Sequence, residues 1–395
     1  MTQPASSPIN LAQLQRRALV VGCIGVALCL LWGTFLNPVQ FFYSYLMAFL
    51  FWVGIALGSL AILMLHHLVG GAWSAMIQRV LEAATRTLPL LAVFFVPLLF
   101  GMGALYSWAR PEVVAADVIL QHKRAYLNVP FFIVRTVIYF AIWLLMAQCL
   151  NRWSRQHEAT VGQPTQDQVR RRLRLLSAPG LGLYALTVTF ASIDWVMSLE
   201  PYWYSTMYGV LFIVGQALSA LAFAIVAVSL FAATEPVASV ATPERFHDLG
   251  NLLLAFVMLW AYIGFSQFLI IWSGNLAEEV PWYLHRTRGG WDGMAMFLIL
   301  FHFALPFVLL LIRSTKRHVR ALASVATLVC CVHVVDLFWL VLPALHQSAL
   351  RVHWMDIVAP IGLGGIWLAL FTRNLATRSL IPLEDRRLRG ATEHA

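Results

Sequence analysis

The chain has 395 residues, of which 60% are hydrophobic and 11% are charged. An average soluble protein carries about 25% charged residues, so a soluble globule of this length could not cover its surface with so few. The composition therefore excludes a disordered chain, a collagen, a secreted disulfide scaffold and an ordinary cytosolic enzyme. It predicts a polytopic membrane protein.

About ten apolar runs follow a polar N-terminal segment. Each approaches the roughly 20 residues that a bilayer-spanning helix needs, and none shows the alternating pattern of a barrel strand. The expected cores are 18–36, 44–67, 87–108, 130–150, 176–198, 205–232, 249–272, 292–312, 319–342 and 355–373. We therefore expect an all-α polytopic protein forming one integral membrane domain over 1–395, with a short interfacial helix at 71–86 and a cytoplasmic tail at 374–395.

The 27 Lys and Arg residues outnumber the 18 Asp and Glu residues, and most of the basic residues lie in the loops between the expected spans. The N-terminal segment and every second loop after it hold 20 of the basic residues, the opposite side holds 6, and Arg135 falls inside a span. Cytoplasmic loops of membrane proteins collect basic residues. The charge thus predicts a multi-pass protein with both termini cytoplasmic, and it argues against a nucleic-acid partner.

The five cysteines lie in or beside apolar runs and form no C-x-x-C, C-x-x-C-H or zinc-type spacing. Buried free cysteines usually act as small hydrophobic residues. We therefore expect no metal site, no iron–sulfur cluster and no covalently attached cofactor in this chain. The residues concerned are Cys23, Cys29, Cys149, Cys330 and Cys331.

Ionisable residues inside or beside the spans are the candidates for function, because they are expensive to place in a bilayer. They gather toward the expected outer side, and they are Arg135, Asp194, Glu200, His302, His333, Asp336 and Asp356. His333 and Asp336 share a helix face at i, i+3 spacing. That pairing suits a proton acceptor or relay, and equally a polar contact that holds two helices together.

Two alternatives concern single residues of this set. Arg135 either extends toward the outer surface or pairs with a nearby carboxylate. His302 and His333 lie at matching depth on successive spans, which would allow a haem between them, although two histidines also match by chance. No catalytic residue is assigned to this chain.

A faint repeat joins the two halves of the chain. Asp194 and Asp336 lie 142 residues apart, and each is followed seven residues later by a proline, Pro201 or Pro343. The repeat predicts two parallel-related four-helix bundles, spans 2–5 within 36–200 and spans 6–9 within 201–345, flanked by spans 1 and 10. The alternative is chance recurrence of one short motif.

Four longer motifs stand out in the sequence. They are Ser192-Ile-Asp-Trp-Val-Met-Ser-Leu-Glu-Pro-Tyr-Trp-Tyr-Ser-Thr206, Leu259-Trp-Ala-Tyr-Ile-Gly-Phe-Ser-Gln-Phe-Leu-Ile-Ile-Trp-Ser-Gly-Asn275, Glu278-Glu-Val-Pro-Trp-Tyr283 and Val332-His-Val-Val-Asp-Leu-Phe-Trp339. Together they resemble the ActF-type membrane subunit (quinone-binding subunit 2) of bacterial alternative complex III, in the superfamily of NrfD and polysulfide reductase membrane subunits. The resemblance is strongest over 180–345. One departure is Tyr202, where a histidine is expected.

The resemblance implies a quinol:cytochrome c (or other electron acceptor) oxidoreductase of a bacterial inner-membrane respiratory chain. It implies a ten-span fold of two bundles, with quinol oxidation or proton conduction supported by the residues named above. Quinone or quinol is the implied ligand. The implied partners are a multihaem cytochrome subunit, an iron–sulfur subunit and a sister NrfD-like membrane subunit, together with membrane lipid and the quinone pool.

Two other functions fit the same composition. An ion-coupled secondary transporter would also have ten spans and buried carboxylates, but its helices are usually broken at matching places in both halves. Pro97, Gly215 and Pro306 do not correspond in this way. A purely structural membrane scaffold would use every buried charge for helix packing.

Overall fold

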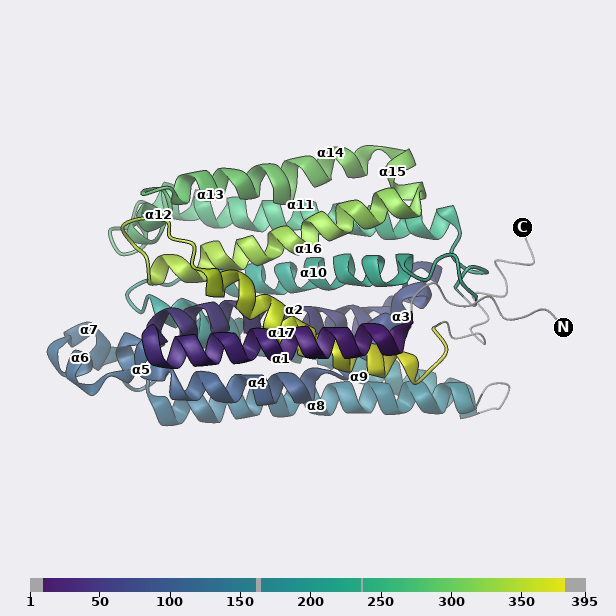
Figure 1. Ribbon diagram of the computed structural model, residues 1–395, viewed down its shortest axis with the longest axis horizontal. Helices are drawn as coiled ribbons and strands as arrows, with labels where there is room; N and C mark the ends of the chain where they lie inside the picture. Colours follow the sequence, from purple (N-terminus) through teal and green to yellow (C-terminus); the bar gives the residue numbers. More distant parts are fainter. Residues whose placement is uncertain (1–9, 161–164, 236, 381–395) are drawn as a thin grey trace.

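The computed structural model describes residues 10–160, 165–235 and 237–380, and the expected tail lies outside them beyond residue 380. Every regular element in this part of the chain is a helix (Figure 1). The long helices are α1 (Leu11–Leu36), α2 (Pro38–Val69), α8 (Val129–Ala159), α9 (Thr165–Trp195), α10 (Tyr208–Ser229), α11 (Pro243–Gly274), α16 (Val319–Val341) and α17 (Trp354–Ala376). The protein is thus an all-α polytopic membrane protein.

Shorter helices complete the structure. They are α3 (Ala72–Thr85), α4 (Leu88–Phe100), α5 (Met102–Leu105), α6 (Pro111–Ala116), α7 (Val118–Lys123), α12 (Val280–Arg286), α13 (Trp291–Leu298), α14 (Leu305–Leu311) and α15 (Arg313–Arg317). A π-helical turn, η3 (Ile299–Ala304), joins α13 to α14 into one span, and the 3-10 turns η1 (Ser107–Ala109), η2 (Met197–Leu199) and η4 (Leu342–Ala344) follow α5, α9 and α16.

Nine helices of the described chain are long and apolar enough to cross a membrane, or ten if one bent pair counts as a span. That pair is α3 and α4, which meet at an angle of 41°. The expected third span, 87–108, is helical in three pieces: α4 ends at Phe100, α5 covers Met102–Leu105 and η1 covers Ser107–Ala109. The 13 residues of α4 alone rise about 20 Å, too little for a hydrocarbon core of about 30 Å.

The expectation of an interfacial helix over 71–86 is wrong, because α3 is buried on its polar face as well as its apolar one. Glu82 on this helix is 3% exposed. Its carboxylate accepts hydrogen bonds from Gln78 (2.8 Å), Arg79 (2.6 Å), Ser154 (2.6 Å) and Arg378 (3.2 Å). Buried charges persist where they are paired and hydrogen-bonded, and this network ties α3 to α8 and to the segment after α17.

Helix α2 lies at the centre of the molecule, and 94% of its most apolar window is buried. A helix that is apolar all round is expected to be covered on every side. Contacts run in a ring through α2, α4, α8 and α9, and in a second ring through α10, α11, α13–α14 and α16. Helix α2 also packs extensively on α10 and α17, so the two rings share an interface (Figure 1).

Helices α1 and α17 pack against each other more extensively than any other pair. Four glycines allow this: a Cβ at Gly22 would lie 2.5 Å from the Ile366 nitrogen, and one at Gly365 would lie 2.4 Å from the Ala18 oxygen. Small residues let membrane helices approach closely. The close approaches of Gly22 to residue 366 and of Gly25 to Gly362 show that the two helices run antiparallel.

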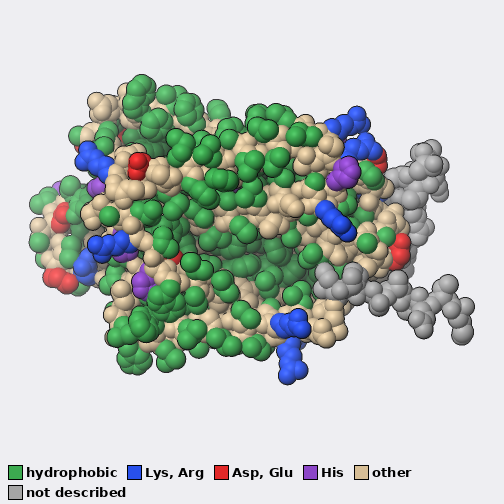
Figure 2. Space-filling model, turned by 45° about the horizontal axis from the view of Figure 1, so that its top comes forward, with side chains coloured by type: hydrophobic (Ala, Val, Ile, Leu, Met, Phe, Trp, Pro, Cys, Tyr) green, Lys and Arg blue, Asp and Glu red, His purple; other side chains and the backbone are tan. Residues whose placement is uncertain are grey.

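The beginning of α1 and the end of α17 therefore lie at one end of the molecule, which we call the terminal end. Helices α5–α7 and α12 lie at the opposite end, which we call the capped end (Figure 1). Figure 2 shows hydrophobic side chains over the middle of the visible face, with Lys, Arg, Asp and Glu gathered toward the two ends. This is the surface of a protein that crosses a bilayer along its long axis.

Candidate functional site

The seven candidate residues fall into four separate groups. Arg135 pairs with Asp194, His302 lies with His333 and Asp336, Glu200 pairs with a residue outside the candidate set, and Asp356 stands apart from all of them. Among the described residues, no hydrogen bond or ion pair joins one group directly to another. The groups therefore need to be weighed one by one.

Arg135 and Asp194 form a bidentate ion pair between α8 and α9. The Arg135 Nε lies 2.8 Å from Asp194 Oδ2, and its Nη2 lies 2.9 Å from Oδ1. The Tyr139 hydroxyl donates to the same carboxylate at 2.8 Å, and Arg135 also donates to the Tyr126 carbonyl oxygen at 3.0 Å. Asp194 is fully buried. Of the two alternatives for Arg135, the structure supports pairing with a carboxylate.

His302, His333 and Asp336 form the second group, between α16 and the α13–α14 span. The His333 Nδ1 lies 3.3 Å from Asp336 Oδ2, and the Trp260 Nε1 donates to that same oxygen at 3.2 Å. The His302 and His333 rings stack with their centroids 5.6 Å apart. One potential ligand atom from each of His302, His333 and Asp336 lies within 4.8 Å of the others.

The position of His302 depends on the π-helical turn η3. This turn carries one residue more than an α-helix over the same stretch, and such turns recur at functional sites. His302 is completely buried, and neither of its ring nitrogens has a hydrogen-bond partner among the described residues. Its ring meets that of Trp260 edge to face, with centroids 4.3 Å apart. The His333 ring lies opposite the His302 ring, with their planes 24° apart.

A small cavity of about 10 Å³ borders this second group, where α2, α10 and α16 meet. That volume is close to what one water molecule requires. Gln216 lines the cavity along with His333 and Asp336, and its Oε1 accepts a hydrogen bond from the Tyr184 hydroxyl at 2.8 Å. Polar groups thus continue from Asp336 toward α9, across the interface between the two helix rings.

Glu200 pairs with Arg286 at the capped end. The Arg286 Nη1 lies 3.0 Å from Glu200 Oε2, and Arg286 also donates to the carbonyl oxygens of Trp282, Trp339 and Leu340. Arg286 is 1% exposed and lies 3.7 Å above the Trp282 ring, a cation–π contact. This arginine joins α12, the end of α16 and the segment after η2.

The electrostatics of this pair predict a pH-dependent stability. Desolvation raises the pKa of the Glu200 carboxyl, but Arg286 and His285 more than offset this, so that pKa lies below its usual value. A depressed folded-state pKa gives stability that is present above the unfolded value, near 4.5, and lost as the pH falls through the folded pKa.

We expect Glu200→Gln to lower the free energy of unfolding by about 1.5–3 kcal/mol at pH 7, because Arg286 loses a charged hydrogen-bond partner. The difference from wild type should shrink below pH 4.5, the ordinary value for this carboxyl. Chemical unfolding of both proteins in detergent across pH 4 to 7 measures it. A difference that stays constant over that range would exclude a charged Glu200.

Asp356 has a structural role at the start of α17. Its Oδ2 accepts from the His353 backbone nitrogen at 2.8 Å, which makes a capping box, and its Oδ1 accepts from Ser44 (2.5 Å) and Gln40 (2.9 Å). Capping of this kind satisfies otherwise unpaired donors of a helix. The carboxylate therefore joins α17 to α2, and both of its oxygens accept hydrogen bonds.

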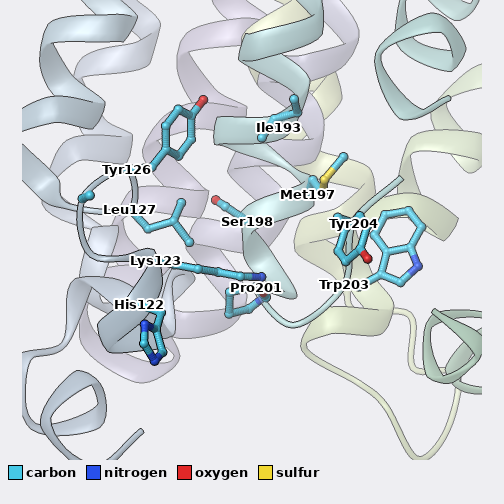
Figure 3. A pocket seen from close by; sticks show the side chains of 11 residues that line it. His122, Lys123, Tyr126, Leu127, Ile193, Met197, Ser198, Pro201, Trp203 and Tyr204 are labelled. Carbon is cyan, nitrogen blue, oxygen red and sulfur yellow. Dashed lines mark hydrogen bonds between the residues drawn. The ribbon is translucent and has the colours of Figure 1, made fainter. Parts of the chain in front are cut away.

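A larger cavity, of about 220 Å³, opens at the capped end (Figure 3). Its walls are mostly apolar, with Leu127 and Met197 among them, and Lys123 reaches across to donate to the Pro201 carbonyl oxygen at 2.6 Å. Burial lowers the pKa of Lys123. The Ser198 hydroxyl in its wall donates to the backbone oxygen of Asp194, so the cavity and the ion pair adjoin.

Sequence reasoning missed several partners of the candidate residues. Tyr139 lies one helical turn after Arg135, so i, i+4 spacing was a usable signal. Trp260 and Arg286 lie 76 and 86 residues from the carboxylates they contact, and no local signal could have found them. Tyr202, which departs from the expected motif, donates instead to Asp117 Oδ2 at 2.6 Å in the capped-end loops.

Comparison with known proteins adds no assignment. No protein-family model matches the chain, and no curated protein matches it either.

Proposed function

We propose that this chain is an integral membrane subunit of a quinol:cytochrome c (or other electron acceptor) oxidoreductase of the alternative complex III type, in which Asp336 and His333 accept protons released on quinol oxidation. The observation that supports this most is the Asp336–His333 pair itself. It is buried among apolar helices, it shares one helix face, and no Lys or Arg among the described residues neutralises its carboxylate. An ionisable residue in such a place is a functional candidate by default.

The buried carboxylates of Asp194 and Asp336 have different surroundings. Asp194 is held by both arms of the Arg135 guanidinium and by the Tyr139 hydroxyl, so its negative charge is strongly stabilised. Asp336 has only a neutral indole donor and an imidazole beside it. We therefore propose Asp336 and His333 as the proton acceptors, and the Arg135–Asp194 pair as a fixed charge pair.

Quinol oxidation releases two electrons and two protons. The electrons and the protons need different acceptors. Protons require a positioned base, for which Asp336 and His333 are suited. Electrons require redox groups, and we propose that partner subunits with haem and iron–sulfur clusters hold them, alongside a sister membrane subunit. The 220 Å³ cavity at the capped end, whose lining includes neither His333 nor Asp336, has apolar walls and polar groups at its edge, as a quinone ring requires.

The orientation of the chain in the membrane is part of the same proposal. We place the chain in a bacterial inner membrane with the terminal end on the cytoplasmic side, as the distribution of basic residues indicates. The capped end, with its cavity, then faces outward. The Asp336–His333 pair lies nearer the outer end of its helix, so protons leave toward that side.

The test is Asp336→Asn in the purified complex, measured by steady-state quinol oxidation and proton release from proteoliposomes. Loss of a positioned base usually costs 10²–10⁴-fold, so we expect at least about a 100-fold lower turnover. Asp292→Asn is the matched control, because that carboxylate is exposed in the first turn of α13. Turnover and proton release equal to wild type in Asp336→Asn would leave the chain a structural scaffold.

A second variant separates the base from general damage to the helix. A Cβ at Gly215 would lie 2.8 Å from His333 Cε1, so Gly215→Ala should move the imidazole without changing a charge. We expect a smaller loss of turnover than in Asp336→Asn. Gly182→Ala is the control, since a Cβ there meets nothing within 4 Å.

A further inference from the structure

The group formed by His302, His333 and Asp336 has the composition of a metal site. Two imidazoles and one carboxylate are the protein ligands of many zinc and non-haem iron centres. The three residues come from two spans, and their potential ligand atoms all lie within 4.8 Å of one another. Sequence spacing gives no sign of this, because 31 residues separate the two histidines.

A second observation points independently to a ligand. His302 is completely buried, yet neither its Nδ1 nor its Nε2 has a hydrogen-bond partner in the described chain. Leaving a buried polar group without a partner is unfavourable, and each such group in a native structure calls for an explanation. The π-helical turn η3, which itself costs regular hydrogen bonding, places this imidazole opposite His333.

The geometry is compatible with a four-coordinate ion. Zinc–nitrogen distances of about 2.0–2.1 Å place tetrahedral ligand atoms about 3.4 Å apart, so these side chains need to close by little more than 1 Å. A cavity of about 10 Å³, close to the volume that one water requires, borders His333 and Asp336. Trp260 donates to Asp336 Oδ2 and would orient the carboxylate, as outer partners of metal ligands do.

We propose that His302, His333 and Asp336 bind one divalent first-row transition metal ion, of the class of Zn²⁺. This site uses the same side chains as the proposed proton acceptor but does not depend on that function. Metal and proton need the same nitrogen and oxygen atoms, so a bound ion would exclude the proton and act as an inhibitor of proton uptake.

The experiment uses the full-length chain, produced with a tag that contains no histidine in cells supplied with Zn²⁺ or Co²⁺. Metal content after purification in detergent is expected to be about one equivalent per chain. The Co²⁺ protein should show visible d–d bands of a low-coordinate nitrogen and oxygen site. It should lack a thiolate charge-transfer band, which separates this site from the five cysteines.

Two variants and one control locate the site. His302→Phe and Asp336→Asn should each lower metal content at least tenfold. His318→Gln removes an exposed histidine near α15 and should leave it unchanged. Folding of each variant is checked by gel filtration and circular dichroism.

The proposal is overturned if the folded wild-type chain retains no metal, or if both ligand variants retain as much metal as the wild-type chain. If a variant does not fold, the Co²⁺ spectrum of the wild-type chain still tests the assigned ligands. A thiolate charge-transfer band, or the absence of d–d bands, would contradict them. Quinol oxidation is not measured in any arm. Failure of the metal site therefore leaves the proposed function standing, and the reverse also holds.

Discussion

Replacing Arg135 with Met is expected to lower the free energy of unfolding by about 3–5 kcal/mol, because it leaves the completely buried Asp194 without its cationic partner. The Tyr139 hydroxyl would remain as a donor, but one neutral hydrogen bond does not replace a bidentate guanidinium. Chemical or thermal unfolding of the detergent-solubilised chain measures the change.

The double variant Arg135→Met with Asp194→Asn tests whether the loss of stability comes from the unpaired charge of Asp194. Removing both members of a buried ion pair is often close to neutral, so the double variant should be more stable than Arg135→Met alone. Arg320→Met, which removes an exposed arginine from α16, should change little. A double variant as unstable as the single one would show that Arg135 acts through packing on Tyr126 and Phe131 and not through its charge.

The second large effect is expected from Gly365→Leu on α17. A Cβ at this position would lie within 2.4–2.6 Å of Ala18 and Gly22 backbone atoms, and backbone cannot move aside as a side chain can. Overpacking of cores costs about 1–3 kcal/mol and sometimes more. Here the two helices must separate, so we expect a loss of at least about 3 kcal/mol in packing.

Cysteine labelling reports this separation directly. Cys29 on α1 is 3% exposed. In a chain that keeps Cys29 as its one cysteine, an uncharged thiol reagent should label it slowly, and Gly365→Leu should accelerate the labelling at least tenfold. Gly182→Leu, at an open position of α9, is the control. Unchanged labelling in Gly365→Leu would mean that α1 is held by contacts other than those with α17.

The sequence was sufficient to predict the class of fold, because membrane-spanning helices can be recognised by their length and hydrophobicity. It was insufficient for α3 and α4, since hydropathy does not reveal a 41° break. The same limit explains the wrong placement of α3 at an interface. Glu82 and Arg79 look like surface charges along the chain, and only the packing of α8 and α17 turns them into a buried network.

The sequence indicated which residues were candidates for the site, but it did not indicate which of them lie together. Depth and scarcity of charge picked out Asp194, His333 and Asp336, and i, i+3 spacing paired the last two. Which carboxylate receives an arginine depends on helix neighbours, and these set the difference between Asp194 and Asp336. Asp356 has a plain capping role that a carboxylate three residues into a helix could have suggested.

The π-helical turn can absorb the loss of one residue from the α13–α14 span. Removing any one residue from 299–304 would let the turn relax into a regular α-helix. Because the turn holds one residue more than an α-helix over the same stretch, the segments on either side would keep their orientation, and Trp291 would stay buried. The change would fall on the turn itself, where His302 would lose its position opposite His333. A single deletion here would therefore disrupt the histidine group and leave the packing of the span in place.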